Sequence, residues 1–187
     1  MTDGWKLPRS LKVGETACKI RADYREVLRV IRVLNDPDLP EFIRWQAALC
    51  LFYEDPVPGY LQVAAIEEMG AFIACGETPA AGQVLIDWEK DAALIAGEVN
   101  KVAGREVRAM EFVHWWTFLG WYHGIGEGQL STVVSIRDKL RRGAPLLDWE
   151  RNYYRENRDR IDLPKRYSAR EKAEQARLQK LLNSERK

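Results

Sequence analysis

The chain has 187 residues, of which 46% are hydrophobic and 30% are charged, and its net charge is +1. This length and apolar content suffice for one buried core and exclude an intrinsically disordered protein. The small net charge excludes a general electrostatic attraction to nucleic acid or to an anionic membrane.

The N-terminal part of the chain predicts a small β-hairpin. Leu11–Val13 and Ala17–Ile20 alternate apolar and polar residues on either side of Gly14-Glu15, which is the pattern of two short strands joined by a tight turn. We expect this hairpin at about residues 10–20. It must pack on other elements, because an isolated hairpin is marginally stable in water.

A series of amphipathic helices follows the hairpin. Apolar residues at helical spacing predict helices over about residues 22–34, 40–52, 61–75, 84–103, 110–123 and 130–141. Asp38 and Glu41 have the spacing of a capping box, and Gly76 and Gly104 are expected at helix C-termini. The 110–123 segment is apolar on every face, which predicts burial on more than one side.

The composition changes after Gly143-Ala144-Pro145. Residues 148–160 predict a mostly polar helix, and Ser168 with Glu171 predicts a capping box that opens a charged helix over residues 169–183. A lone helix of about 15 residues is marginal in water, so we expect it to project or to dock on another subunit. The fold expected is therefore mainly α. A compact helical core domain, residues 1–145, includes the hairpin, and residues 146–187 form a polar, basic extension.

Charge is unevenly distributed along the chain. Residues 137–187 hold 16 basic and 9 acidic side chains, a balance of +7, whereas the first 136 residues carry −6. Opposite signs in two parts of a chain are typical of self-association or of a tail with an acidic partner. A solvated helical surface is the other interpretation.

The cysteines and the hydropathy pattern bear on the compartment. Cys18, Cys50 and Cys75 form no CxxC pair, which favours reduced thiols in a reducing compartment. The first residues lack the apolar run of a signal peptide, and no stretch approaches the roughly 18 apolar residues of a membrane span. We expect a soluble protein with no membrane partner.

Most motifs of catalysis or cofactor binding are missing from the sequence. His114 and His123 lie nine residues apart, on opposite faces of one predicted helix, so they cannot share a metal ion through that helix. No close Cys or His pairs, nucleotide-binding glycine loop or GxSxG elbow is present. The glycine-rich stretch Gly124–Gly128 lacks a following Lys-Ser/Thr and is interpreted as a turn. We expect no enzyme activity, no cofactor and no metal.

Some residues leave two interpretations open. Asp87 and Asp91, with Glu98 further on, could hold a metal or act as an acid–base pair, but a capping and salt-bridging face near a helix N-terminus is favoured. A buried His114 could act as a switch, but a hydrogen-bonded core histidine is favoured.

Aromatic residues raise similar questions. Trp115 and Trp116 point about 100° apart on a helix, so one could face the core and the other a partner, unless all seven tryptophans lie in the core. The basic tail with Trp149, Tyr153 and Tyr154 mixes cations and aromatics as in nucleic-acid sites. Its interspersed acidic residues make nucleic acid an unfavoured partner.

Four motifs, taken together, resemble a known family. They are Ile20–Arg25, Ile86–Ala92 (Ile-Asp-Trp-Glu-Lys-Asp-Ala), His114-Trp115-Trp116-x-Phe118 and Val134–Arg137. Their order and spacing over residues 11–160 resemble the bacteriophage "gene product fifteen" family. The sequence departs from the family in Trp88, where phenylalanine is commoner, and in Val107-Arg108, where the family tends to an Ile-Asp-Leu turn.

The resemblance implies a function. Members of the family are encoded in siphophages and prophages, mainly of Gram-positive hosts, between the genes of the major tail protein and the tape measure protein. The resemblance implies a tail assembly chaperone in the host cell cytoplasm that binds and solubilises the tape measure protein and is absent from the mature virion; the major tail protein is a further candidate partner. The acidic body and basic tail of the chain suggest, as a separate hypothesis, a homo-oligomer with a head-to-tail interface that forms a spiral around the client. No catalytic residues come with the family.

We expect the motif residues to define the fold, with the client bound on neighbouring apolar surface. The residues singled out in this way as family-motif and interaction residues are Asp23, Arg25, Trp88, Asp91, His114, Trp115, Trp116, Phe118 and Arg137. The alternative function is a structural virion component, such as a tail or head–tail connector protein. A nucleic-acid-binding helical protein is a third and less favoured class.

Overall fold

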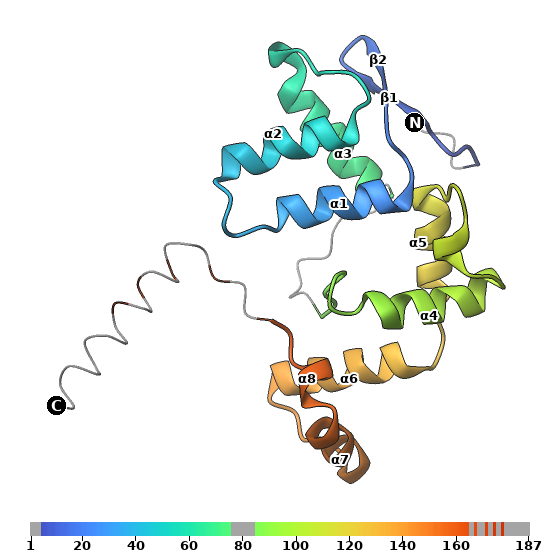
Figure 1. The fold of residues 1–187 in the computed structure, drawn as a ribbon, viewed down its shortest axis with the longest axis vertical. Helices are drawn as coiled ribbons and strands as arrows, with labels where there is room; N and C mark the ends of the chain where they lie inside the picture. The colour runs from blue at the N-terminus through green and yellow to red at the C-terminus, as the bar shows by residue number, and fades with distance from the viewer. Residues whose placement is uncertain are drawn as a thin grey trace.

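The computed structural model describes residues 5–75 and 85–164, together with Tyr167, Glu171, Glu174 and Arg177. Within these residues the fold is mainly helical with one N-terminal hairpin, as the sequence predicts (Figure 1). The elements are β1 (Ser10–Val13), β2 (Thr16–Lys19), α1 (Tyr24–Leu34), α2 (Glu41–Phe52), η1 (Gly59–Leu61), α3 (Gln62–Ile73), α4 (Ala92–Ala103), η2 (Val107–Ala109), α5 (Trp115–His123), α6 (Gln129–Arg142), α7 (Asp148–Glu156) and α8 (Arg158–Ile161).

The hairpin forms where the alternating pattern places it. Strands β1 and β2 pair antiparallel, with Leu11 opposite Cys18 and Val13 opposite Thr16. Gly14 turns the chain with a φ of +60°, a left-handed conformation that glycine adopts without strain. Leu11 and Val13 face inward and are buried, so the hairpin is stabilised by packing on the helices rather than alone.

The main hydrophobic core lies between the hairpin and α1 to α5. Helix α1 packs along α2, and α5 packs against α4 and α1. Tyr24 stacks on Phe118 with ring centroids 4.5 Å apart, and Phe118 in turn stacks on Trp115 at 5.8 Å. Each fully buried large apolar side chain contributes about 1.5–3 kcal/mol, so this aromatic stack is a major source of stability.

A second, smaller cluster lies at the other end of the molecule. Val133 and Ile136 of α6 pack with Ile161 of α8, and Tyr153 and Tyr154 of α7 lie against them. In Figure 1 helices α6 to α8 are at the opposite end from α2 and α3, with α4 and α5 between. The polar stretch after Gly143 is therefore tied to α6 in the part of the chain that the structure describes.

Two predicted helices begin later than the periodicity suggests. The helix predicted over 84–103 begins at Ala92, and described residues 85–91 form a turn because the Asp91 carboxylate accepts a hydrogen bond from the amide of Asp87. The helix predicted over 110–123 begins at Trp115. The residues before it are extended, since Val113 and Trp115 exchange backbone hydrogen bonds with Tyr24 and Ala22. Tertiary contacts override the helical pattern in both places.

Other predicted boundaries differ in smaller ways. The capping box of Asp38 and Glu41 is wrong: Pro40 is the N-cap of α2, with no side-chain capping bond, and the Asp38 amide bonds Asp36 instead. The helix predicted over 148–160 is divided at Asn157, whose φ of −121° and ψ of 28° are not helical and separate α7 from α8. Gly104 ends α4 in the left-handed conformation, as expected. The expected C-cap at Gly76 and most of the helix predicted over 169–183 fall outside the described residues.

Candidate functional site

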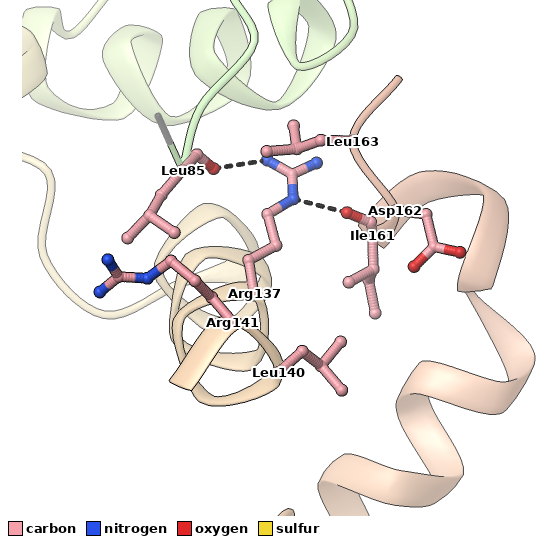
Figure 2. Close-up of a pocket in the computed structure, with 7 residues that line it drawn as sticks. All are labelled: Leu85, Arg137, Leu140, Arg141, Ile161, Asp162 and Leu163. Carbon is pink, nitrogen blue, oxygen red and sulfur yellow. Dashed lines mark hydrogen bonds between the residues drawn. The ribbon is translucent and has the colours of Figure 1, made fainter. Parts of the chain in front are cut away.

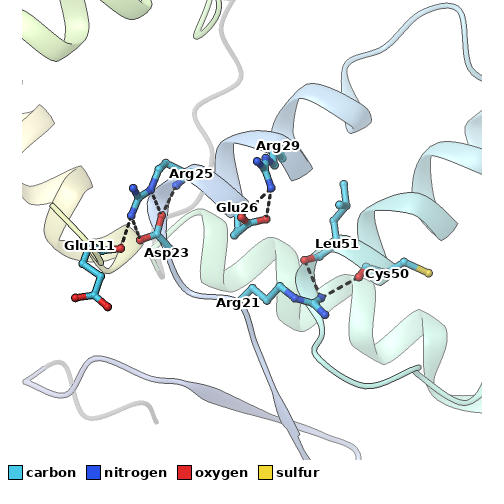
Figure 3. Close-up of polar contacts among 8 residues, drawn as sticks. All are labelled: Arg21, Asp23, Arg25, Glu26, Arg29, Cys50, Leu51 and Glu111. Carbon is cyan, nitrogen blue, oxygen red and sulfur yellow. Dashed lines mark hydrogen bonds and ion pairs between the residues drawn. The ribbon is translucent and has the colours of Figure 1, made fainter. Parts of the chain in front are cut away.

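The first group of motif residues holds the start of α1 against the segment before α5. Asp23 is the N-cap of α1, and its carboxylate accepts from the Arg25 amide at 3.0 Å, the Arg25 Nε at 2.7 Å and the Val113 amide at 3.0 Å. Arg25 also donates to the carbonyl of Glu111 at 2.7 Å, as Figure 3 shows. Burial raises the pKa of Asp23, but the bonds from Arg25 and Val113 outweigh it and leave the pKa below its ordinary value.

His114 is the N-cap of α5 and is only 3% exposed. Its Nδ1 accepts from the Trp116 amide at 3.1 Å, so Nε2 carries the proton and donates to the Pro8 carbonyl at 2.9 Å. Burial lowers the pKa of His114. The ring is therefore neutral, and it ties the residues before β1 to the start of α5. This placement agrees with the hydrogen-bonded core histidine that the sequence favours.

The tryptophans of the His-Trp-Trp motif both point toward α3. Their indole nitrogens donate to the last carbonyls of that helix, Trp115 to Ile73 and Trp116 to Phe72, each at 2.9 Å. Trp115 is buried and Trp116 half-buried. Both indole N–H groups are thus used within the fold, and the interpretation that one tryptophan also faces a partner stays a prediction for the half-buried Trp116. The alternative that all seven tryptophans are buried is wrong, because Trp5 is 97% and Trp149 55% exposed.

The second polar group joins α4, α6 and α8 around one guanidinium. Arg137 forms two bonds with the Asp91 carboxylate, at 2.6 and 2.9 Å. Its other N–H groups donate to the carbonyls of Leu85 (2.9 Å), Arg160 (3.0 Å) and Ile161 (2.6 Å). All five donors of the side chain are used. Asp91 and Arg137 are 1% and 5% exposed, so this is a buried, fully satisfied ion pair.

The carboxylates that could have formed a metal or acid–base site are committed to these contacts. Asp87 does not lie on a helix, and its Oδ1 accepts from the amides of Glu89 and Lys90 at 3.0 Å. Glu98 pairs with Lys101 at 2.8 Å. Among the described residues no three His, Cys, Asp or Glu side chains gather where a metal ion could bind. None of the described helices combines the length and the apolar character needed to cross a membrane.

The motifs that are distant in the sequence meet in space. Trp88 of the Ile86–Ala92 motif packs against Trp115 of the His-Trp-Trp motif, with ring centroids 6.0 Å apart, and against Tyr122 at 5.1 Å. Asp91 of the Ile86–Ala92 motif pairs with Arg137 of the Val134–Arg137 motif. The aspartate of the early motif binds the backbone directly before His114. The nine residues singled out from the sequence therefore lie in two groups of contacts, one around Trp115 and one around the Asp91–Arg137 ion pair, which the chain from Trp88 to Asp91 connects.

Two polar contacts could not be predicted from the sequence. Arg21 donates to the carbonyls of Cys50 and Leu51 in the last turn of α2 (Figure 3), and also to the carbonyl of Tyr53, which follows it. Glu150 is 2% exposed and accepts from Lys139 at 2.6 Å. The Lys139 bond lowers the pKa of Glu150. Cationic side chains often bond the last carbonyls of a helix. Arg21 precedes α1 but bonds the end of α2, and sequence spacing cannot predict a contact between two different elements.

A pocket of about 230 Å³ adjoins Arg137 between α6 and α8 (Figure 2). It is lined mainly by aliphatic side chains, with polar groups of Arg137, Arg141 and Asp162 among them; the aliphatic ones are Leu85, Leu140, Ile161 and Leu163. On the same end of the molecule Leu147 and Trp149 are exposed by 56% and 55%. This end combines a small hollow with exposed apolar side chains, which suits apolar side chains of another polypeptide.

The chain matches no family model, no curated protein and no solved structure.

Proposed function

We propose that the protein is a phage tail assembly chaperone that binds the tape measure protein and keeps it soluble. The observation that carries the proposal is the meeting of the resembling motifs, through the Trp88–Trp115 contact and the Asp91–Arg137 ion pair. Motifs that belong to one family are expected to contact one another in the folded protein, whereas short sequence matches that arise by chance need not.

The distribution of apolar surface supports a role in binding. Most motif side chains are engaged inside the fold, and among the described residues several exposed apolar side chains gather at the α6–α7 end and on α2 and α3, besides others such as Trp5, Val102 and Phe112. We assign client binding to the α6–α7 end, with an apolar side chain of the client in the pocket beside Leu140. Amphipathic helices are commonly recognised by such apolar surfaces, and the role requires no chemistry.

Co-expression tests the proposal. The partner is a candidate tape measure protein, the product of a very long helical open reading frame next to this gene, produced alone, with the wild-type chain, or with a Leu140→Glu variant that places a charge in the pocket. We expect the wild-type chain to raise the soluble fraction of the tape measure protein several-fold and Leu140→Glu to remove most of that gain. Leu140→Met, which keeps the pocket apolar, is the matched control and is expected to behave as the wild type.

Mass spectrometry of purified particles separates this function from the structural alternative. A chaperone is absent from the virion, whereas a tail or connector component is present in a fixed copy number. Detection of the chain in particles at fixed stoichiometry, or equal solubility of the tape measure protein with and without it, would contradict the proposal.

A further inference from the structure

A second exposed apolar surface lies on α2 and α3. Phe42 is 69%, Tyr60 85% and Val63 72% exposed. The start of α3 lies beside the second turn of α2, because Gln46 and Gln62 are joined by a hydrogen bond of 2.8 Å. Phe42 lies one turn before Gln46, while Tyr60 and Val63 lie close to Gln62 along the chain. We call this surface, with the neighbouring acids described next, the α2–α3 face.

The α2–α3 face is strongly acidic. Residues 35–75 contain seven acidic side chains and one basic one, Arg44. Arg44 is directed inward and donates to the Leu34 carbonyl at 3.1 Å. Glu67 is exposed one turn after Val63 on the same side of α3. Within the described chain, neither Glu67 nor Glu41 nor Glu68 forms a salt bridge. The face therefore presents apolar side chains among unneutralised negative charge.

The same chain carries a segment of complementary chemistry. Residues 165–187 contain eight basic and three acidic side chains. The sequence spacing of Leu178, Leu181 and Leu182 is that of one side of a helix. The segment begins after α8, at the opposite end of the molecule from α2 and α3 (Figure 1). Each copy thus has an acidic, apolar face at one end and a basic segment with apolar residues attached to the other.

We propose that the α2–α3 face binds residues 165–187 of a second copy of this chain. Such a head-to-tail contact joins two different surfaces, so it can be repeated from copy to copy. Opposite charges steer the two surfaces together and fix their register, and the apolar side chains between them are removed from water. The contact does not use the client surface on α6 and α7. It can therefore be tested separately from the proposed function.

Sedimentation velocity of the full chain over a range of concentrations tests this contact. At about 0.05 M salt we expect the mean mass to rise with concentration to that of a dimer or larger species. At about 1 M salt, where charges are screened over roughly 3 Å, we expect mostly monomer. A monomer mass at every concentration in low salt would overturn the proposal.

Charge reversal identifies the two surfaces. One variant carries Glu41→Lys, Glu67→Lys and Glu68→Lys, and another carries Arg170→Glu, Lys172→Glu, Arg177→Glu and Lys180→Glu. Each alone is expected to raise the dissociation constant at least tenfold. The decisive step is to mix the two variants: each now supplies the complement of the other, so a mixed dimer should form with close to wild-type affinity.

Two controls separate loss of this contact from a general effect of charge and from unfolding. A variant with Glu15→Lys, Glu111→Lys and Glu127→Lys changes the charge by the same amount at exposed positions outside the face and should associate as the wild type does. Circular dichroism establishes that each variant is folded, and the tail variant leaves α1 to α8 unaltered. Equal loss of association in the control, or no mixed dimer from two folded variants, would refute the contact, as would a compact monomer whose tail binds its own α2–α3 face.

Discussion

Around α5 the chain is held together by stacked aromatic rings and by buried aliphatic residues of α1 to α3. Around α6 the apolar cluster is much smaller, and α8 is fixed by the bonds of Arg137 with Asp91, Leu85 and Ile161. Apolar burial is non-directional, so the first region depends on volume and packing. A buried ion pair is directional and has a large desolvation cost, so the second region depends on every partner being present.

This difference predicts how a substitution in each region should lower stability. A cavity in the α5 region removes packing that all the surrounding helices share, so its cost falls on the whole fold. Loss of the Arg137 guanidinium leaves a buried carboxylate and three carbonyls without their donor. That cost falls first on the attachment of α8 and the turn at residues 85–91, which contribute fewer apolar contacts of their own.

The largest effect is expected for Trp115→Ala. This variant opens a cavity in the aromatic stack, removes the bond to Ile73, and should lower the free energy of unfolding by about 3–5 kcal/mol. Urea denaturation followed by circular dichroism should show one transition at lower urea concentration. The exposed Trp149 supplies the control, since Trp149→Ala should change the free energy of unfolding by less than about 0.5 kcal/mol. Similar losses for both variants would contradict the assignment of the core.

Arg137→Met should cost about 3 kcal/mol or more, because it leaves the Asp91 carboxylate buried and unpaired. Hydrogen exchange should show lost protection first in α8 and at residues 85–91, and only later in α5. In the double variant Arg137→Met with Asp91→Leu no charge is left unpaired, so part of the stability should return; the Asp87 amide and the three carbonyls still lack their partners, which keeps the recovery incomplete. If α5 loses protection together with α8, the two regions are not held separately.

The junction of the two regions is expected to be sensitive to a single methyl group. A Cβ on Gly128, at the start of α6, would lie 2.7 Å from Oε1 of Glu98, whose side chain is nearly buried and paired with Lys101. Gly128→Ala should therefore cost about 1–3 kcal/mol in thermal or urea unfolding. Gly126→Ala is the matched control, since its Cβ would meet nothing within 4 Å, and it should be nearly neutral.

The smallest effect is a dependence of stability on pH that comes from His114. Its folded pKa lies below the ordinary value of 6.5, so the unfolded chain binds the proton more readily. The contribution is fully present above about pH 6.5 and is lost as the pH falls toward the folded pKa. Protonation also places a proton on Nδ1, which can then no longer accept from Trp116. His114→Asn keeps a capping side chain without the titration, so its unfolding free energy should fall less between pH 7 and pH 5.

Local periodicity was enough to predict the hairpin and the position of most helices, because those patterns depend on neighbours in the sequence. Local periodicity failed to predict the conformation of segments whose structure is set by residues distant in the sequence. The bonds of Val113 and Trp115 with Tyr24 and Ala22 draw the residues before α5 into an extended conformation. The Asp91 carboxylate holds the preceding residues in a turn.

The site was predicted in part. The motif residues were identified, but not their partners: the ion pair of Asp91 joins it to a residue 46 positions later, and helical spacing carries no information over that distance. The contacts of Arg21 with α2 and of Glu150 with Lys139 were missed for the same reason, since each joins two different elements. The direction of the tryptophans was also beyond the pattern, because the 110–123 segment is apolar on every side.

The bond between His114 and Pro8 spans 106 residues, and that between Val113 and Asp23 spans 90. During synthesis the hairpin and α1 to α3 therefore leave the ribosome long before the residues that close over them. Until α5 has been made, the apolar surface of these early elements that it covers, such as the ring of Tyr24, remains exposed, and incompletely folded chains with exposed apolar surface are prone to aggregate.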